Sequence, residues 1–224
     1  FLKLTFSNRP SDGFLIMPEK IFLSIAGNIG SGKSSLTKMI ADEFGWVPYF
    51  ESVSDNPYLA DFYNDMERWS FNLQVYFLSH RFRIHKEIIS LDSSVIQDRS
   101  IYEDVEIFAR NLYELGRMDE RDYKNYKNLF IEMTSYLKAP DMLVYLKADV
   151  NTLINQIKLR GREFEKSIER EYLEKLNLSY NSWIENYNYG KCLTIETDEL
   201  DFVKNPEHRD FIINEIKDKL SGIR

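Results

Sequence analysis

The sequence has little of what secreted, membrane-spanning and nucleic-acid-binding proteins depend on. Its single cysteine, Cys192, cannot form a disulfide within the chain, which suits a reducing compartment. No apolar run approaches the roughly 20 residues that a membrane-spanning helix needs. The net charge of -7 argues against nonspecific binding to nucleic acid or to an anionic membrane. We therefore expect a cytoplasmic protein with no nucleic-acid partner and no membrane partner.

The first residues also lack the continuous apolar segment of a secretory signal. Because Met17 directly precedes the first strand-like run, we expect residues 1–16 to be a leader or tag-like extension outside the fold. The rest of the chain has no internal repeat, no low-complexity segment and no linker rich in proline, glycine or serine. We expect residues 17–224 to form a single domain.

Short apolar runs alternate with helical patterns along this domain. The runs predict strands over 20–26, 46–52, 93–100, 139–147 and 190–197. Apolar residues at three- and four-residue spacing predict helices over 33–44, 67–90, 101–116, 119–138 and 206–220. Strands that alternate with helices indicate an α/β fold, in which a five-stranded parallel sheet carries helices on both faces.

The segment AGNIGSGKSSL joins the first predicted strand to the first predicted helix. Gly27 to Ser34 fit the pattern G-x-x-x-x-G-K-[ST] without a gap. Glycines let backbone N–H groups converge on phosphate oxygens, and the following helix offers its positive N-terminus. An ordinary glycine-rich turn is the alternative, but the flanking strand and helix are the context that the motif requires. The predicted ligand is a nucleoside triphosphate, held by Gly27, Asn28, Ile29, Gly30, Ser31, Gly32, Lys33, Ser34 and Ser35.

Charged residues follow the second and third predicted strands. Glu51 ends the second strand, and Asp98 and Arg99 end the third. The carboxyl ends of neighbouring parallel strands meet in one crevice, here beside the phosphate loop. A carboxylate there can take a proton from an acceptor hydroxyl, and an arginine can stabilise the transferring phosphoryl group. A solvated strand end is the alternative interpretation of Glu51. These residues predict phosphoryl transfer, and the absence of an N-K-x-D motif argues against a GTPase switch.

Several segments together match one known family. The chain resembles the deoxyribonucleoside kinases from about residue 20 to its C-terminus. The resemblance rests on GNIGSGKSS, Glu51, ERWSFNLQVYFLSHR, DRSIYED, LRGR and EYLEKLN. Enzymes of this family use ATP to phosphorylate the 5′-hydroxyl of a deoxynucleoside. The resemblance implies a P-loop kinase fold with an arginine-bearing lid, ATP as phosphate donor, Mg²⁺ as cofactor and a homodimer.

The resemblance also implies roles for the residues around the phosphates. Glu51 resembles the general base for the 5′-hydroxyl, and Arg99 resembles the residue that orients this hydroxyl. Lys33, which the loop motif places at the β- and γ-phosphates, is the third catalytic candidate. Asp98 resembles the acid near Mg²⁺, and the Ser34 hydroxyl is the expected metal ligand beside it.

The lid and the sugar pocket have implied residues as well. Arg160 and Arg162 resemble the lid arginines, which close over the phosphates and exclude water.

Tyr63 and Glu171 resemble the pair that binds the 3′-hydroxyl, and Phe108 resembles the aromatic side chain that stacks on the base. Asp201 matches, weakly, the family's loop around the adenine of ATP. One departure is Gln156, which stands where some members have another lid arginine.

Gln74, Arg81 and Asp104 resemble the residues that read the base. The amide of Gln74 can flip, so it does not choose a base by itself. An ionised Asp104, held charged by Arg81, only accepts hydrogen bonds and therefore favours a base with an exocyclic amine over thymine. Asn56 or Pro57 stands where some members have a tryptophan, which leaves room for a purine. We predict deoxyadenosine as substrate, and deoxycytidine and deoxyguanosine remain alternatives.

Two other functions stay open at this point. A nucleoside monophosphate kinase, such as a thymidylate kinase, shares the phosphate loop and the lid. Its substrate brings a phosphate of its own, so it needs no general base such as Glu51. A regulatory protein that binds ATP without turnover would not need Glu51, Arg99 and the lid arginines together. A phosphorylation assay over nucleosides and monophosphates separates these functions.

Overall fold

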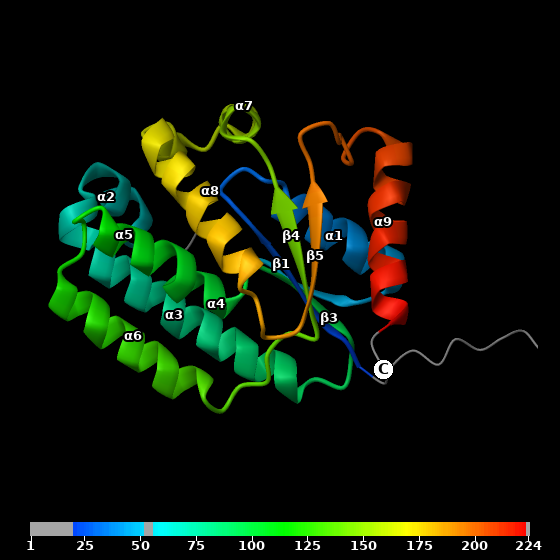
Figure 1. Cartoon of the computed structure of the whole chain (residues 1–224), viewed down its shortest axis with the longest axis horizontal. Helices are drawn as coiled ribbons and strands as arrows, with labels where there is room; N and C mark the ends of the chain where they lie inside the picture. The colour runs from blue at the N-terminus through cyan, green and yellow to red at the C-terminus, as the bar shows by residue number, and fades with distance from the viewer. Residues whose placement is uncertain (1–19, 52–55, 223–224) are drawn as a thin grey trace, which may run out of the picture.

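The chain folds around a parallel sheet with helices on both faces (Figure 1). The computed structural model describes residues 20–51 and 56–222, so the expected extension over residues 1–16 lies outside the described residues. The strands are β1 (Phe22–Gly27), β2 (Val47–Tyr49), β3 (Val95–Asp98), β4 (Met142–Lys147) and β5 (Lys191–Glu196). Their order is β2-β3-β1-β4-β5, and every pairing is parallel. The predicted five-stranded α/β architecture is therefore confirmed.

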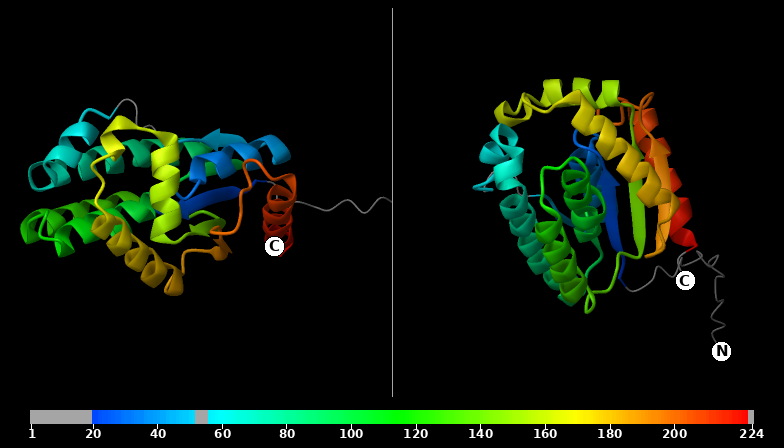
Figure 2. Two further views of the ribbon diagram at one scale, coloured as in Figure 1. Left: turned by 90° about the horizontal axis from the view of Figure 1, so that it is seen from above. Right: turned by 60° about the vertical axis from the view of Figure 1, so that its left-hand side comes forward.

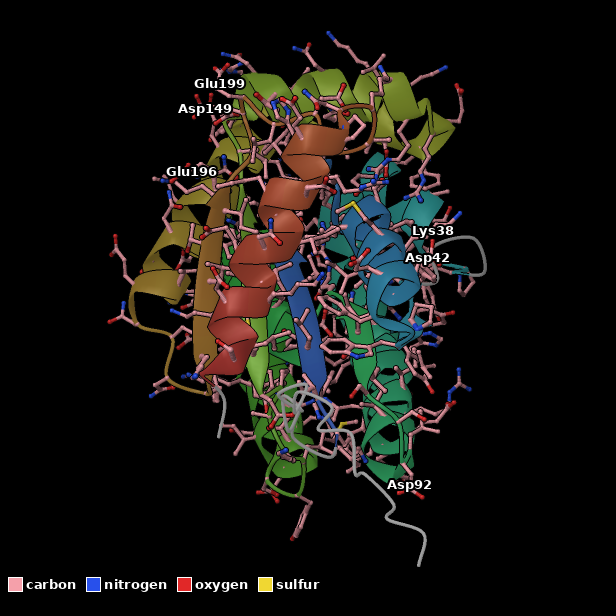
Figure 3. The ribbon with its side chains drawn as sticks, turned by 90° about the vertical axis from the view of Figure 1, so that its right-hand side faces the viewer. Lys38, Asp42, Asp92, Asp149, Glu196 and Glu199 are labelled. Carbon is pink, nitrogen blue, oxygen red and sulfur yellow. The ribbon has the colours of Figure 1, made fainter. Side chains whose placement is uncertain are left out.

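The helices cover the sheet on both sides. They are α1 (Lys33–Phe44), α2 (Leu59–Asn64), α3 (Met66–Ser90), α6 (Glu120–Thr134), α7 (Val150–Arg160), α8 (Arg170–Glu185) and α9 (Pro206–Ser221). Helices α1 and α9 lie side by side on one face (Figure 3), and Lys217 of α9 pairs with Glu43 of α1 at 2.8 Å. Among the described helices, none has the length and apolar character that crossing a membrane requires.

The alternation of side chains along the strands divides the core into two layers. On β4, Leu143 and Tyr145 pack into the layer formed with α3, α6 and α8. Met142, Val144 and Leu146 point the other way and pack with α1 and α9. Successive side chains of a strand point to opposite faces, so a central parallel strand has apolar residues on both. This explains why the central strands appear in the sequence as continuous apolar runs.

Strand β2 is shorter than the run over 46–52 predicts. It pairs through Val47–Tyr49 at the edge of the sheet and is largely exposed. Pro48 in its middle has no N–H to donate, which a sheet tolerates only at an edge strand. The strand nevertheless ends two residues before Glu51, so it delivers this carboxylate to the carboxyl edge of the sheet.

The segment predicted as one helix over 101–116 contains a π-helical turn. It consists of α4 (Ile101–Glu103), the π-helix η1 (Asp104–Ala109) and α5 (Arg110–Glu114). The wider π turn changes which side chains share a face, and such turns occur often at functional sites. Here it carries Asp104 and Phe108, two of the predicted substrate residues.

Candidate active site

A cavity of about 780 Å³ opens at the carboxyl edge of the sheet. Helix α7 passes beyond the tips of β4 and β5 at this edge (Figures 1 and 2). Most of the predicted site residues line the cavity: Ile29, Gly30, Ser31, Gly32, Lys33, Ser34, Ser35, Glu51, Tyr63, Gln74, Arg81, Asp98, Arg99, Asp104, Phe108, Arg160, Arg162 and Asp201. The described residues of its lining do not include Gly27, Asn28 or Glu171. The fold thus brings together segments that are far apart in the chain.

The phosphate loop has the backbone that its glycines predict. Gly30 and Gly32 have φ angles of 87° and 90°, in the left-handed region that favours glycine. The side chain of Asn28, predicted to contact the nucleotide, instead anchors the loop to α8. Its Nδ2 donates to Leu173 O at 3.0 Å and to Asn177 Oδ1 at 2.6 Å. The side chain of Asn28 therefore holds the phosphate loop in place against α8.

Lys33 is buried against its own loop. Its Nζ donates to the backbone oxygen of Asn28 at 2.8 Å. Burial, together with the nearby Arg99 charge, lowers the pKa of Lys33 to about 7. Phosphate oxygens are strong acceptors for such an amine, and their charge favours its protonated form.

Ser34 and Asp98 meet beside this lysine. The Ser34 hydroxyl donates to Asp98 Oδ2 at 2.5 Å. The other carboxylate oxygen, Asp98 Oδ1, is buried and has no hydrogen-bond partner among the described residues. A hydroxyl beside a half-satisfied carboxylate is a donor set that suits Mg²⁺, which uses one or two protein oxygens and completes its shell with phosphates and water.

Glu51 lies between two arginines. Arg81 Nη2 donates to Glu51 Oε1, and Arg99 Nε is 3.5 Å from Glu51 Oε2. Burial alone would raise the pKa of Glu51, but the charges of Arg99 and Arg81 outweigh it and lower the pKa to about 2. Glu51 is therefore ionised at neutral pH and is aligned by both guanidinium groups.

Arg81 also binds the predicted base-reading acid. Its Nε donates to Asp104 Oδ1 at 2.8 Å, and both side chains are buried. Burial raises the pKa of Asp104 to about 7, although the Arg81 charge acts in the opposite direction. The predicted contact of Arg81 with Asp104 is confirmed, but the expectation that Arg81 keeps Asp104 fully ionised is not, because burial outweighs the Arg81 charge and raises the pKa. The link from Arg81 to Glu51 was not predicted, and it connects the residues expected to read the base to the carboxylate expected to act as general base.

Two buried acceptors remain free at the end of the cavity that α3 and η1 line. Gln74 Oε1 and Asp104 Oδ2 have no hydrogen-bond partner among the described residues. Both residues line the cavity and are at most 2% exposed. Buried acceptors without partners are costly, which indicates that this end of the cavity is built to receive hydrogen-bond donors.

Arg99 has an uncommon backbone conformation. Its φ of 70° is the only positive value among the described residues other than glycine. A bulky side chain in the left-handed region costs free energy, and such strain persists mostly at functional sites. The conformation directs the guanidinium over the ring of Phe108, with the Cζ atom 4.3 Å from the ring centroid.

The two arginines predicted for the lid share one buried carboxylate. Arg160 binds Glu165 through Nε at 3.0 Å and Nη2 at 2.7 Å, and Arg162 Nη1 lies 3.3 Å from the same side chain. Next to it, Phe164 stacks on Tyr63, with 6.2 Å between the ring centroids. Burial, and the Glu165 charge among smaller causes, raise the pKa of Tyr63. Glu165 is thus a buried acid close to Tyr63.

The structure places Glu171, the acid expected beside Tyr63, away from the cavity. Its side chain is 71% exposed and lies 3.6 Å from Lys175 on the surface of α8. Helix α8 starts at Arg170, so position 171 is in a solvated first turn, whereas the 3₁₀ turn η2 (Glu163–Glu165) brings Glu165 inward. Glu165, not Glu171, therefore accompanies Tyr63 in the cavity lining.

The comparisons with known proteins agree with this geometry. The family model described as deoxynucleoside kinase matches residues 23–221. The chain belongs to the deoxynucleoside kinase family. It is 40% identical to a deoxyadenosine/deoxycytidine kinase of Bacillus subtilis over 202 residues, which cover 89% of this chain and 93% of that protein. It is 38% identical to a deoxyguanosine kinase of Lactobacillus acidophilus, with 89% and 90% covered.

A solved structure shares the fold of this kinase. It is the deoxyadenosine kinase from M. mycoides with bound dATP, at a TM-score of 0.79 and 30% identity. The match covers 88% of this chain and 99% of that chain. Family and fold together confirm that the chain is an enzyme that phosphorylates deoxynucleosides. They decide against the monophosphate kinase and the regulatory protein.

Two buried glutamates in or next to the site have no predicted role. One is Glu165, described above. The other is Glu103, which lies behind the cavity lining, is fully buried, and accepts from Tyr180 Oη at 2.7 Å and from Gly27 N at 3.4 Å. It also forms a capping box with Ser100 at the start of α4. The S-x-x-E spacing of this capping box is visible in the sequence and could have indicated that a helix begins after Ser100, with Glu103 in its first turn.

Proposed function

We propose that this kinase transfers the γ-phosphoryl group of ATP to the 5′-hydroxyl of deoxyadenosine. The unpartnered acceptor Asp104 Oδ2 is the observation that carries the choice of base, and the amide of Gln74 beside it can present its oxygen to the same group. The exocyclic amine of adenine has two N–H donors, which Asp104 Oδ2 and Gln74 Oε1 can accept. Cytosine offers a similar amine, so deoxycytidine is the second candidate. The carbonyls of thymine, and O6 of guanine, would meet an acceptor in this place, although guanine has an amine elsewhere on its ring.

Three charged side chains carry the proposed transfer. Glu51, ionised and aligned by two arginines, accepts a hydrogen bond from the 5′-hydroxyl and takes its proton as the bond to phosphorus forms. A carboxylate with a pKa of about 2 is a weak base, so the proton moves only once the attacking oxygen has become acidic. Lys33 stabilises the charge on the β- and γ-phosphates, and Arg99 orients the hydroxyl and the transferring group.

Ser34 and Asp98 are the residues that would hold Mg²⁺ beside these phosphates. Their hydroxyl–carboxylate pair and the unpartnered Asp98 Oδ1 support this assignment. When bound, Mg²⁺ neutralises charge on the β- and γ-phosphate oxygens. Arg160 and Arg162 lie at the cavity edge, from which they can reach phosphate oxygens and exclude water.

Tyr63 and Glu165 are the proposed pair for the 3′-hydroxyl of the sugar. Both line the cavity, and the stack of Phe164 on Tyr63 keeps the lid turn next to α2. A phenol and a carboxylate can together donate to and accept from one hydroxyl. This assignment replaces Glu171, whose side chain lies on the surface of α8.

The proposal includes the assembly and the extent of the domain. We propose a homodimer and a single catalytic domain over residues 17–224. The exposed apolar side chains Leu129 of α6 and Tyr136, seven positions further on, offer a surface for a second copy. Sedimentation velocity tests the dimer, and a variant with Leu129 and Tyr136 both changed to Ser should sediment as a monomer.

A phosphorylation panel tests the proposed function. The purified chain is assayed with ATP and Mg²⁺ on the four deoxynucleosides, on adenosine and on the deoxynucleoside monophosphates. We expect the highest kcat/KM on deoxyadenosine, a lower value on deoxycytidine, and no turnover on monophosphates. Lys33→Ala is the matched negative control. A preference for thymidine would overturn the base assignment, and turnover on monophosphates alone would overturn the acceptor class.

A further inference from the structure

His208 is a cavity-lining residue to which neither the motifs nor the proposed transfer gives a role. It lies in the first turn of α9, which is capped by the side chain of Asn205 and starts at Pro206. The backbone N–H of Asp201 donates to His208 Nδ1 at 2.9 Å. A backbone N–H can only donate, so Nδ1 is the acceptor and the proton of the neutral ring is on Nε2.

This hydrogen bond closes the loop over residues 197–205, between β5 and α9. The loop is tied to the sheet where Thr197 N donates to Lys147 O at 2.8 Å. Its far end is tied where Asn205 N donates to Asp201 O at 2.8 Å, and Lys204 N donates to Asp201 Oδ1 at 3.0 Å. Asp201 is thus the residue on which these hydrogen bonds of the loop converge. Its backbone oxygen is bonded by Asn205, and its backbone N–H is bonded by the imidazole of His208.

The loop rests on the phosphate loop through the residue after Asp201. Phe202 is 6% exposed and belongs to the core layer of α1 and α9. A Cβ atom placed on Gly32 would lie 2.8 Å from the Cζ atom of the Phe202 ring. The ring therefore packs directly on the backbone of Gly32. A displacement of Asp201 would be passed to Phe202 and from there to the phosphate loop.

The position of the loop within the cavity indicates what it contacts. In the strand order β2-β3-β1-β4-β5, Glu51 follows β2, the phosphate loop follows β1 and residues 197–204 follow β5, so the phosphate loop lies between the other two segments. The transferred γ-phosphate must lie next to the acceptor hydroxyl, so the base of the donor extends toward the β5 side. That side of the cavity is lined by residues 197–204 and by His208.

We propose that His208 is a positioning residue for the phosphate donor. By accepting from Asp201 N–H, its Nδ1 holds the 197–205 loop in the shape that receives the base of ATP, with Phe202 seated on Gly32. The inference rests on the proposed function, since it assigns this end of the cavity to the donor. It makes the imidazole a determinant of donor affinity and leaves the deoxynucleoside end independent of it.

Three substitutions test whether the acceptor at Nδ1 is what matters. His208→Ala removes the acceptor, His208→Asn keeps one near the position of Nδ1, and His208→Gln moves it outward, toward the position of Nε2. Glu207→Ala, on the neighbouring exposed residue, is the matched control. KM is measured for ATP and for deoxyadenosine, and the dissociation constant for ADP is measured by calorimetry without turnover.

We expect His208→Ala and His208→Gln to raise the KM for ATP and the dissociation constant for ADP by roughly 3- to 10-fold, the effect of one lost hydrogen bond. The kcat value and the KM for deoxyadenosine should stay within about twofold of wild type. His208→Asn should restore wild-type values. The inference is overturned if His208→Ala binds ADP as the wild type does, if His208→Gln rescues as well as His208→Asn, or if both substrates weaken equally. A wild type that neither binds ADP nor turns over would instead overturn the proposed function.

Discussion

Two charged clusters of the cavity lining differ in how deeply they are buried. In the cluster around Glu51, Arg81, Arg99 and Asp104 have side chains that are at most 5% exposed, and with Glu51 they form one connected network. In the cluster around Glu165, the proposed lid, Arg160 and Arg162 are 34% and 35% exposed and both pair with Glu165. Buried charges need partners in fixed geometry, whereas half-exposed charges can exchange a carboxylate for a phosphate at small cost.

In the proposed mechanism this difference corresponds to a division of work between the two clusters. The proposed deoxynucleoside-binding cluster would have its groups aligned before the substrate arrives, because each buried charge is already held by another. The proposed lid would exchange contacts, which suits arginines that are accessible and paired with one acid. Substitutions should therefore cost most in the buried network and least at the exposed rim, and the expected effects below follow that order.

The largest effect is expected at the centre of the network. Glu51→Gln keeps the shape of the side chain but removes its charge, so kcat should fall by about 10²- to 10⁴-fold while deoxynucleoside affinity changes little. Arg81 and Arg99 lose a counter-charge, so thermal stability should fall as well. Steady-state kinetics and a melting curve measure the two effects. A variant that keeps its kcat and loses only affinity would make Glu51 a binding residue instead of the general base.

The coupling of Arg81 to two acids predicts the next effect. Arg81→Met alone leaves Asp104 buried without its partner and changes the surroundings of Glu51, so activity on every base should fall. With Asp104→Ala added, the acceptor that opposes thymine is gone. The ratio of kcat/KM for thymidine to that for deoxyadenosine should then rise by roughly 10- to 100-fold.

That ratio is the informative quantity, because any loss through Glu51 affects both substrates equally and cancels. Wild type, both single variants and the double variant are compared on the same two nucleosides. If the double variant discriminates against thymidine as strongly as the wild type does, base selection lies outside Asp104.

The success of the sequence-based predictions follows a physical pattern. The phosphate loop, Glu51 and Asp98 were found because their placement depends on local spacing and on where strands end, which the alternation of strands and helices fixes. Arg81 and Asp104 were paired by resemblance, and their contact is confirmed at 2.8 Å. The second partner of Arg81 was missed, because Glu51 is 30 positions away in the chain and periodicity says nothing about such a contact.

The lid shows where the sequence alone is insufficient. Glu165 and Glu171 both belong to one charged stretch, and helical periodicity gives no reason to prefer either. Two local features decide which glutamate faces the cavity. A three-residue 3₁₀ turn points Glu165 inward, and the start of α8 leaves Glu171 exposed to solvent. Such short turns have no repeat long enough to detect. The π turn at Asp104–Ala109 cannot be predicted either, because it is short and the surrounding sequence pattern is that of an ordinary α-helix.

These two glutamates provide a matched pair of variants with a smaller expected effect. Glu165→Gln should raise the KM for deoxyadenosine by about 10-fold, because a charged hydrogen bond to the 3′-hydroxyl becomes a neutral one and the two lid arginines lose their acid. Glu171→Gln, on the exposed face of α8, should change it by less than about twofold. The comparison uses the same substitution six positions apart. The opposite ranking would restore Glu171 to the sugar pocket.

The smallest expected effect concerns a single proton on Lys33. Its pKa of about 7 lies below the ordinary lysine value because the buried ammonium is desolvated and faces Arg99. In the free enzyme the amine is thus mostly charged at pH 6 and mostly neutral at pH 8. Phosphate oxygens favour the charged form, so their arrival raises this pKa. ATP binding should therefore take up about 0.9 proton at pH 8 and about 0.1 at pH 6, and affinity should fall as pH rises above 7.

Calorimetry in buffers of different ionisation enthalpy measures this uptake directly. Lys33→Arg, which stays charged throughout the range, should remove the uptake at pH 8, and the difference between the two proteins corrects for protons bound by the nucleotide itself. Equal uptake by both would mean that Lys33 is already charged in the free enzyme. The hydrogen bond from Lys33 Nζ to the backbone oxygen of Asn28 would then be enough to keep the buried amine protonated, despite its desolvation.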